Sequence, residues 1–345
     1  MMGTVQVMCR ASRLGEQRPG GPAPSLSNLY APILEDLTRA KEIFDAELLS
    51  EFPFVNDLCD TIRSYRGKML RPALLLLSGK AAGTVSSCHH VLAAVVEIVH
   101  MATLVHDDVI DSADERRRRP TIRRLTGNVG AVLLGDFLIS HAFHLCSSLP
   151  NRHASRRIGA TTNVVCEGEL LQNRYAGDVS IDERIYLEIV RRKTGALTAA
   201  ACELGAYFAN AEEAVVSALR DFGENAGIAF QIMDDLLDLA GDEASVGKSL
   251  GRDHTTGTLT LPLIHGLARA RGETRNLLLE CLARETPSDR HRLRTLLHES
   301  ESLDYALEVA ERHVDEARRK LESVPPGDAK TTLSTMADFI LQRSF

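Results

Sequence analysis

The chain has 345 residues, of which 44% are hydrophobic and 25% are charged, so it can bury a sizeable core. Its formal net charge of −7 gives no reason to expect nucleic-acid binding, and seven scattered cysteines without a C-x-x-C pair indicate free thiols in a reducing, cytoplasmic compartment. The longest uncharged stretch contains glycine, serine and two histidines and falls short of about 18 apolar residues, so the sequence predicts no membrane span.

The predicted secondary structure is helical throughout. Alanine, leucine, glutamate and arginine are abundant, and no long period-two alternation predicts a sheet. Residues 1–24 are rich in glycine, proline and arginine and lack the apolar core of a secretory signal, so we expect a disordered N-terminal segment. Apolar residues then recur at helical spacing, and no linker divides residues 25–345, which we expect to form one all-α domain.

A basic motif lies between the second and third predicted helices. Lys68 and Arg71 stand just before Pro72, and this proline fits the first turn of a helix, where its missing N–H has no partner to lose. The two basic side chains would then lie at a helix N-terminus, which attracts anions. A charged loop that merely starts a buried helix is the alternative, and the acidic clusters further along favour the anion site.

The apolar residues 81–106 lead into an acidic cluster with aspartates at i, i+1 and i+4: Asp107, Asp108 and Asp111. Helical periodicity predicts that Asp107, Asp111 and Asp114 share one face. Crowded carboxylates repel unless a cation lies between them, and Mg²⁺ prefers oxygen ligands that it shares with substrate phosphates. The arginines at 116–119 suit phosphate oxygens. A single cluster of this kind is more often a solvated helix end, so its interpretation depends on a second copy.

The second copy repeats the spacing after an equally apolar stretch: Asp234, Asp235 and Asp238. Gln231 precedes it by one turn. Two such helices that face each other would form a metal-filled mouth above an apolar interior. The polar, glycine-rich residues 241–262 carry Lys248 and Arg252 and have the character of a lid that closes over phosphates.

Further helices are predicted at residues 128–145, 163–175, 181–192, 196–206 and 329–343, with two or three more amphipathic helices between residue 262 and the last of these. We expect the first of these to be buried, and the fourth to lie deep because its residues are small and apolar. His100 lies two turns before Asp107, and a lone histidine on an apolar helix is usually a core residue without a functional partner.

In this order and spacing the motifs resemble those of the trans-isoprenyl diphosphate synthases, the polyprenyl synthetase family, from about residue 26 to the end. The resemblance rests on Gly67-Lys68-x-x-Arg71-Pro72, His100, Asp107-Asp108-x-x-Asp111 with Arg116-Arg117, Lys193-Thr194, Gln231-x-x-Asp234-Asp235-x-x-Asp238, Gly247-Lys248 and Thr260-Leu261-Pro262. It implies a polyprenyl synthetase domain over residues 25–345, an antiparallel helical bundle around a central apolar cavity. It also implies a homodimer, with a hetero-oligomer as the alternative.

The implied activity is chain-elongating prenyl transfer, in which an allylic diphosphate ionises, isopentenyl diphosphate attacks the carbocation and a proton leaves. Farnesyl or geranylgeranyl diphosphate is the implied primer, and Mg²⁺ is the implied cofactor. The implied metal ligands are Asp107, Asp108, Asp111, Asp234, Asp235 and Asp238. Isopentenyl diphosphate would bind Lys68, Arg71, His100 and Arg117. The allylic diphosphate would bind Arg116, Lys193, Thr194, Gln231 and Lys248. The residues expected to carry the chemistry are Asp107, Asp108, Asp111, Arg116, Lys193 and Asp234.

The resemblance also bears on product length. In the family, an aromatic residue five positions before the first aspartate blocks the product tunnel. This chain has Ala102 there, Ile98 one turn below it, and no aromatic residue in 81–106. We therefore predict a product longer than geranylgeranyl diphosphate. In the alternative, Ala102 packs against a neighbouring helix and another element sets the tunnel floor.

Two positions depart from the family's pattern. Arg118 stands where a glycine often follows the arginine pair, and Thr258 replaces a lysine common before Thr-Leu-Pro. The threonine at position 258 cannot make the diphosphate contact of that lysine, and Arg252 could make this contact instead.

Four other functions remain open. One is a shorter-chain farnesyl or geranylgeranyl diphosphate synthase of the same family. A helical metal phosphohydrolase would use His89 or His90 with His106 and Asp107, but it leaves the second acidic cluster unexplained. A terpene cyclase would need an aromatic-lined pocket, and an aromatic content of 5% argues against one. A non-catalytic partner subunit would tolerate loss of the clusters, yet both are present.

Overall fold

The computed structural model describes residues 26–240, 258–284 and 286–342. The segment predicted over residues 1–24 lies outside the described residues, as do Lys248 and Arg252 of the predicted lid. The described residues are helical apart from turns and two very short strands, which confirms the all-α prediction.

The helices follow one another as α1 (Leu26–Tyr30), η2 (Ala31–Ile33), α2 (Leu34–Glu47), α3 (Pro53–Tyr65), α4 (Leu70–Ala82), α5 (Ser87–Ile110), α6 (Ile122–Ser147), α7 (His153–Arg174), α8 (Glu183–Val190), η3 (Arg191–Gly195), α9 (Ala196–Phe208), α10 (Glu213–Ala240), α13 (Leu261–Arg269), α14 (Gly272–Arg284), α15 (Pro287–Glu299), α16 (Ser302–Lys320), η4 (Leu321–Ser323) and α17 (Asp328–Leu341). Between α5 and α6, strands β1 (Glu115–Arg116) and β2 (Arg119–Pro120) pair antiparallel.

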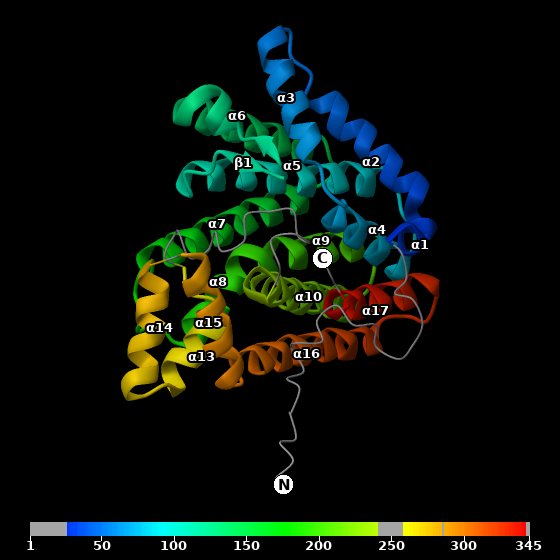
Figure 1. Cartoon of the computed structure of the whole chain (residues 1–345). Coiled ribbons are helices and arrows are strands. Elements are labelled where there is room, and N and C mark those ends of the chain that lie inside the picture. Colours follow the sequence, from blue (N-terminus) through cyan, green and yellow to red (C-terminus); the bar gives the residue numbers. More distant parts are fainter. Residues whose placement is uncertain (1–25, 241–257, 285, 343–345) are drawn as a thin grey trace.

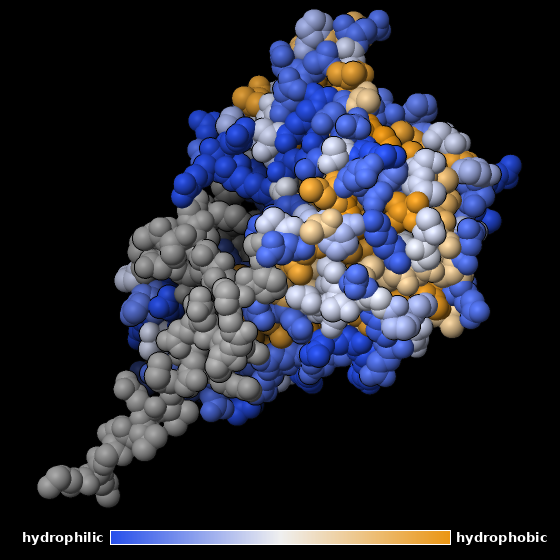
Figure 2. Space-filling view, turned by 90° about the vertical axis from the view of Figure 1, so that its right-hand side faces the viewer, coloured by the Kyte–Doolittle hydropathy of each residue, from blue (hydrophilic) through white to orange (hydrophobic). Residues whose placement is uncertain are grey.

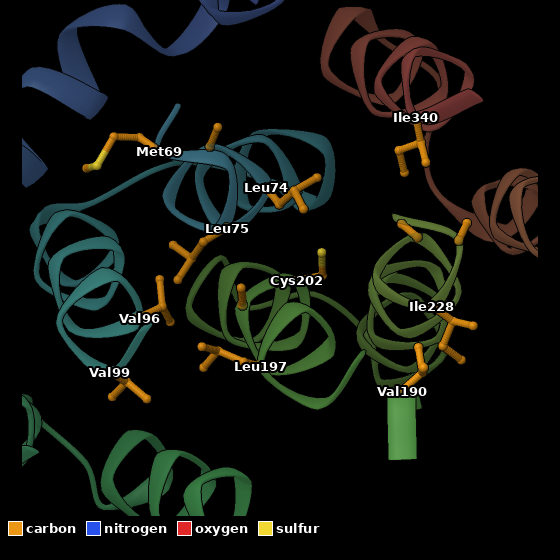
Figure 3. Close-up of a cluster of buried hydrophobic side chains, with 14 of the residues drawn as sticks. Met69, Leu74, Leu75, Val96, Val99, Val190, Leu197, Cys202, Ile228 and Ile340 are labelled. Atoms are coloured by element: carbon orange, nitrogen blue, oxygen red, sulfur yellow. The ribbon is translucent and has the colours of Figure 1, made fainter. Parts of the chain in front are cut away.

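Helices α4, α5, α9 and α10 form the centre of the bundle (Figure 1). Their side chains meet those of α17 in one apolar cluster (Figure 3). Helix α9 is built from small residues, so α4 can approach closely: a Cβ on Gly205 would lie 2.2 Å from the Leu75 carbonyl oxygen. This confirms that the small-residue helix lies deep. Helix α4 also packs on α5, and Arg71 at the start of α4 lies near enough to His100 of α5 for its charge to act on that imidazole.

A tight hairpin follows α5. Its strands pair Arg116 with Arg119, and the two turn residues, Arg117 and Arg118, have φ angles of 51° and 62°. Two consecutive positive φ angles define the turn that matches the twist of antiparallel strands, and glycine is favoured there. Arg118 thus adopts a left-handed backbone conformation that glycine adopts more readily than arginine.

Helix α6 differs from the sequence-based expectation. Its bounds span a kink at Gly127, where φ is 74° and ψ is 175°, so the long helical part begins at Asn128 as predicted and a short turn from Ile122 precedes it. The helix is not buried on all sides, because Val129 is 74% exposed and Leu133 is 62% exposed. Helices α5 and α6 are both long and apolar enough to cross a membrane, although the sequence predicted no span. In α5 most of that stretch is buried inside the bundle, which explains its apolar character. On the face shown in Figure 2, apolar residues are interspersed with polar ones.

Candidate active site

The first acidic cluster lies at the C-terminal end of α5. Asp108 is buried, and its Oδ1 accepts hydrogen bonds from Nε and Nη2 of Arg116 at 3.0 and 2.9 Å. Desolvation raises the pKa of Asp107 to about 7, against the opposing positive charge of Lys193. Asp111 caps the helix, and its backbone N–H donates to the Asp107 carbonyl oxygen at 2.8 Å.

The expected face shared with Asp114 does not form. Helix α5 ends at Ile110, four residues before position 114, so the helical repeat does not reach Asp114. The Asp114 carboxylate instead pairs with Nη1 of Arg123 at 2.8 Å, and its backbone carbonyl accepts the N–H of Thr121. Asp114 therefore belongs to the loop that anchors the hairpin to α6.

Lys193 lies in the π-helical turn η3, between α8 and α9. Its Nζ is 2.5 Å from Glu169 and donates to Gln172 at 3.1 Å, both on α7. Desolvation alone would lower the pKa of Lys193, but the negative charges of Asp107 and Glu169 hold it above its usual value. Single π-turns inside helices are frequent at functional sites, because they re-aim the side chains that follow.

The second acidic cluster lies on α10. Asp235 is buried, and both of its carboxylate oxygens accept hydrogen bonds, one from the Tyr186 hydroxyl at 2.6 Å and one from Gln231 Nε2 at 2.8 Å. The Gln231 side-chain oxygen accepts from the Thr194 hydroxyl at 2.9 Å. These contacts favour a positioning role for Asp235, and its predicted role as a metal ligand stays a prediction. Asp234 and Asp238 are half-buried on the same helix.

Two consecutive residues connect the clusters. The Lys193 ammonium acts on Asp107 of the first cluster, and the hydroxyl of Thr194 binds Gln231 of the second. The π-turn therefore lies within electrostatic reach of the first cluster and is hydrogen-bonded to Gln231 beside the second. That the two clusters face each other across one metal site stays a prediction.

The basic motif at the start of α4 lies beside the hairpin. The Arg117 guanidinium donates to the Tyr65 carbonyl oxygen at 2.5 Å and leaves no room for a Cβ on Gly67, which would lie 2.7 Å from it. Lys68 is exposed in the same loop. Arg117 and Lys68, distant in sequence, thus border one site.

Arg71 lies under this loop. Desolvation lowers its pKa, while the negative charges of Glu97 and Asp234 oppose that shift. Its buried Nε makes no hydrogen bond within the described part of the chain. Desolvation and the charges of Arg71, Arg116 and Arg117 hold the pKa of His100 well below its usual value, so this imidazole is neutral. A buried guanidinium with unused donor capacity beside a neutral imidazole suits an anion.

Four residues of the site were not predicted from the sequence. Glu97 is buried among the basic residues, and burial raises its pKa although Arg71, Arg66 and Arg117 oppose the shift. Glu97 is the only Asp, Glu, Lys or Arg of α5 before the acidic cluster. A single charge in an otherwise apolar helix could have marked this residue as part of a site. The others are Glu169, Gln172 and Tyr186, whose partners lie on other helices.

The predicted chain-length residues are deep in the core. Ala102 and Ile98 have no exposed surface. An apolar cavity of about 30 Å³ lies between α4, η3, α10 and α17, with Leu74, Phe230 and Ile340 in its lining. Arg71 borders this cavity. Neither Ala102 nor Ile98 lines it, so their role in chain length stays a prediction.

The histidines of the alternative phosphohydrolase do not come together. His89 contacts the Gly205 carbonyl oxygen at 3.0 Å, and His90 pairs with Asp36 at 2.9 Å. His106 lies 3.3 Å from the Val132 carbonyl oxygen. The three histidines thus contact partners on three different helices and form no common site, which argues against a metal phosphohydrolase.

The chain is similar to known proteins of one family. The sequence pattern of one family, polyprenyl synthetase, matches residues 53–299. The chain is 32% identical over 312 residues to octaprenyl diphosphate synthase of Escherichia coli, covering 90% of this chain and 96% of that protein. It is also 32% identical over 324 residues to heptaprenyl diphosphate synthase component 2 of Geobacillus stearothermophilus, covering 93% and 99%.

The fold is similar to that of solved structures. A polyprenyl synthase from Caulobacter crescentus, complexed with calcium and isoprenyl diphosphate, superposes with a TM-score of 0.88 at 33% identity, covering 94% of this chain and 99% of that one. Since the family pattern covers most of the chain and near full-length relatives exceed 30% identity, this chain belongs to the polyprenyl synthetase family of prenyltransferases.

Proposed function

We propose that this protein is an all-trans polyprenyl diphosphate synthase that adds isopentenyl diphosphate repeatedly to an allylic diphosphate, with Mg²⁺ as the metal. The observation that carries this proposal is the connection of the two acidic clusters through Lys193 and Thr194. Two carboxylate clusters with the π-turn between them, bordered by the desolvated cations Arg71 and Lys193, suit a diphosphate held through metal.

The donor set fits a hard divalent cation. Asp107, Asp111 and Asp234 offer only oxygen atoms, which Mg²⁺ prefers. The raised pKa of Asp107 is what crowding and burial of carboxylates produce in the absence of a cation. When bound, Mg²⁺ would neutralise the departing diphosphate. The calcium and isoprenyl diphosphate in the Caulobacter relative support a metal–diphosphate site of this kind.

The protein's own residues divide between two substrates. Arg116, Lys193, Thr194, Gln231 and Lys248 would hold the allylic diphosphate. Lys68, Arg71, His100 and Arg117 would hold isopentenyl diphosphate, and buried Glu97 balances their charge. No nucleophilic side chain is needed, because ionisation of the allylic diphosphate supplies the electrophile, and the departing diphosphate accepts the proton.

A product longer than geranylgeranyl diphosphate is supported by two observations. Helix α5 carries no Phe, Tyr or Trp between Ser87 and Ile110, so no side chain of these types on α5 would narrow a product path below the first cluster. The relatives reported above are named octaprenyl diphosphate synthase and heptaprenyl diphosphate synthase component 2, and both names refer to products longer than geranylgeranyl diphosphate. A farnesyl or geranylgeranyl diphosphate synthase is the less favoured alternative.

We further propose a homodimer that covers the exposed apolar face of α6, which includes Leu125, Val129, Val132 and Leu133. Such a face is unfavourable in water and typical of protein interfaces. Light scattering after gel filtration should show a dimer for the wild type and a monomer for Leu133→Glu. The control Leu34→Glu changes an equally exposed leucine on α2 and should remain dimeric. An active monomer, or a need for a second protein, would contradict this assembly.

The proposed domain spans residues 25–345, and the proposed compartment is the cytoplasm, which six free cysteines among the described residues support. The activity is tested by mass analysis of products from the purified chain with isopentenyl diphosphate and farnesyl or geranylgeranyl diphosphate. Products beyond geranylgeranyl diphosphate are expected. No product from the chain alone would favour a partner subunit, and a shorter product would favour the alternative synthase.

A further inference from the structure

Three metal-ligating side chains converge away from the active site, where the end of α2 meets the last turns of α6. The Nδ1 atoms of His141 and His144 each lie 2.8 Å from the same carboxylate oxygen of Glu47. All three potential ligand atoms lie within 4.8 Å of one another. No other group of this kind, with histidine, cysteine or acidic ligands, occurs among the residues that the structure describes.

The spacing of the three atoms is close to that of a bound metal. Zn²⁺ binds imidazole nitrogen and carboxylate oxygen at about 2.0–2.2 Å, so its tetrahedral ligands lie roughly 3.4 Å apart. The nitrogen–oxygen distances of 2.8 Å would need to open by only about 0.6 Å. His141 and His144 are three residues apart on one helix, which directs both rings to the same side.

The electrostatics of Glu47 also favour a cation. Glu47 is the last residue of α2, where the helix dipole places partial negative charge. Its side chain is only 14% exposed, so water screens it little. Both imidazoles direct Nδ1 to the same carboxylate oxygen of Glu47, which crowds three potential ligand atoms around one point. A divalent ion between the three side chains would supply both the bonds and the charge.

The ligand types select a different metal from that of the active site. Two imidazole nitrogens with one carboxylate suit Zn²⁺ and neighbouring transition metals, whereas Mg²⁺ prefers oxygen alone. His144 is 73% exposed, which gives an ion access and leaves room for water as a further ligand. The Phe137 ring lies 4.2 Å from the His141 ring and limits its rotation.

We propose that Glu47, His141 and His144 form a binding site for Zn²⁺ or a similar transition-metal ion, separate from the Mg²⁺ site. The ion bound there would fasten the end of α2 to α6. Helix α2 otherwise packs on α5. The ion would therefore act as a structural link in the part of the bundle away from the chemistry.

The test uses the full chain, freed of metal with EDTA and returned to buffer containing millimolar MgCl₂, so that Mg²⁺ occupies the aspartate clusters. Zn²⁺ is then titrated in competition with a coloured zinc chelator. The expected result is one Zn²⁺ per chain with about micromolar affinity, and a melting temperature raised by several degrees at saturating Zn²⁺. The His141→Asn/His144→Asn variant should lose both effects.

Two further variants make the result specific. Glu47→Gln keeps an acceptor for both histidines but removes the charge, and it should weaken Zn²⁺ binding at least about tenfold. In the control His153→Asn, the histidine lies 3.9 Å from Glu203, whose charge Arg157 already pairs at 2.7 Å, so binding should be unchanged. The proposal would be overturned if the wild type did not bind Zn²⁺. It would also be overturned if Glu47→Gln and the double variant bound Zn²⁺ as tightly as the wild type does.

Discussion

The Tyr186 hydroxyl donates a 2.6 Å hydrogen bond to the buried carboxylate of Asp235. The other oxygen of that carboxylate accepts from Gln231, whose own oxygen accepts from Thr194. Helix α8, the second acidic cluster and the π-turn are thereby joined in one chain of hydrogen bonds. Asp235 fixes the orientation of Gln231, which in turn faces the residues proposed to hold the allylic diphosphate.

Tyr186→Phe should remove one of these bonds with little change in volume. A hydrogen bond to a charged, buried acceptor is worth about 1.5–3 kcal/mol, so we expect a lower free energy of unfolding. Because Gln231 is then less well held, the KM for the allylic diphosphate should rise about tenfold, with a smaller change for isopentenyl diphosphate. The control Tyr305→Phe removes a similar 2.7 Å bond to Glu183 and should leave both KM values unchanged. Lost stability without a change in KM would indicate a purely structural role for Tyr186.

Asp107→Asn and Asp234→Asn should each reduce turnover by about two orders of magnitude or more while circular dichroism stays helical. Each removes a carboxylate proposed to bind metal. Asp114→Asn is the matched control, because this nearby aspartate pairs with Arg123 and should be dispensable for turnover. EDTA should abolish activity and added Mg²⁺ should restore it. Full activity in EDTA would exclude the metal-dependent reaction.

Binding of Mg²⁺ should depend on pH through Asp107. Its folded pKa of about 7 is above the unfolded value of 3.8, so folding favours the protonated form. In metal-free protein, protonated Asp107 contributes to the free energy of unfolding. This contribution is complete below pH 3.8 and is lost as the pH rises through about 7. Mg²⁺ needs the ionised form, so its affinity without substrate should be about tenfold higher at pH 8 than at pH 6. Calorimetric titration checks this, and equal affinities at the two pH values would contradict it.

The two diphosphate sites should separate in kinetics. Arg71→Ala and Lys68→Ala should raise the KM for isopentenyl diphosphate more than that for the allylic primer. Lys193→Ala should have the opposite effect. Loss of one charge-assisted contact is worth about 1.5–3 kcal/mol, or roughly a tenfold to hundredfold weakening. Steady-state kinetics with each substrate varied in turn measures both constants. Parallel changes for the two substrates would refute the assignment.

Ala102→Phe tests whether α5 borders the growing product. If an open path lies beside Ala102, the added ring should shorten the products while the protein stays stable. If Ala102 only packs against a neighbouring helix, the ring should cost about 1–3 kcal/mol of stability without a defined shift in products. Ala94→Phe places the same ring at another fully buried alanine of α5 and should show only the second behaviour. Product masses and thermal melting distinguish the outcomes.

The sequence alone determined the helical fold and the two acidic clusters, because both depend on short-range spacing along one chain segment. Apolar periodicity predicts helices, and the repeated aspartates at i, i+1 and i+4 indicate a candidate metal site before the packing of the helices is known. Local signals failed where an element ended. Asp114 left the predicted face because α5 stops at Ile110 and a hairpin begins.

Only the tertiary structure decided which residues from distant segments share the site. Glu169 meets Lys193, Tyr186 meets Asp235, and Glu97 lies among arginines from other elements. Each contact depends on how helices cross, which is set by packing over the whole core and not by neighbours in sequence. Only the tertiary structure shows that one apolar face of α6 is exposed, because its sequence is equally compatible with burial inside the bundle or at an interface.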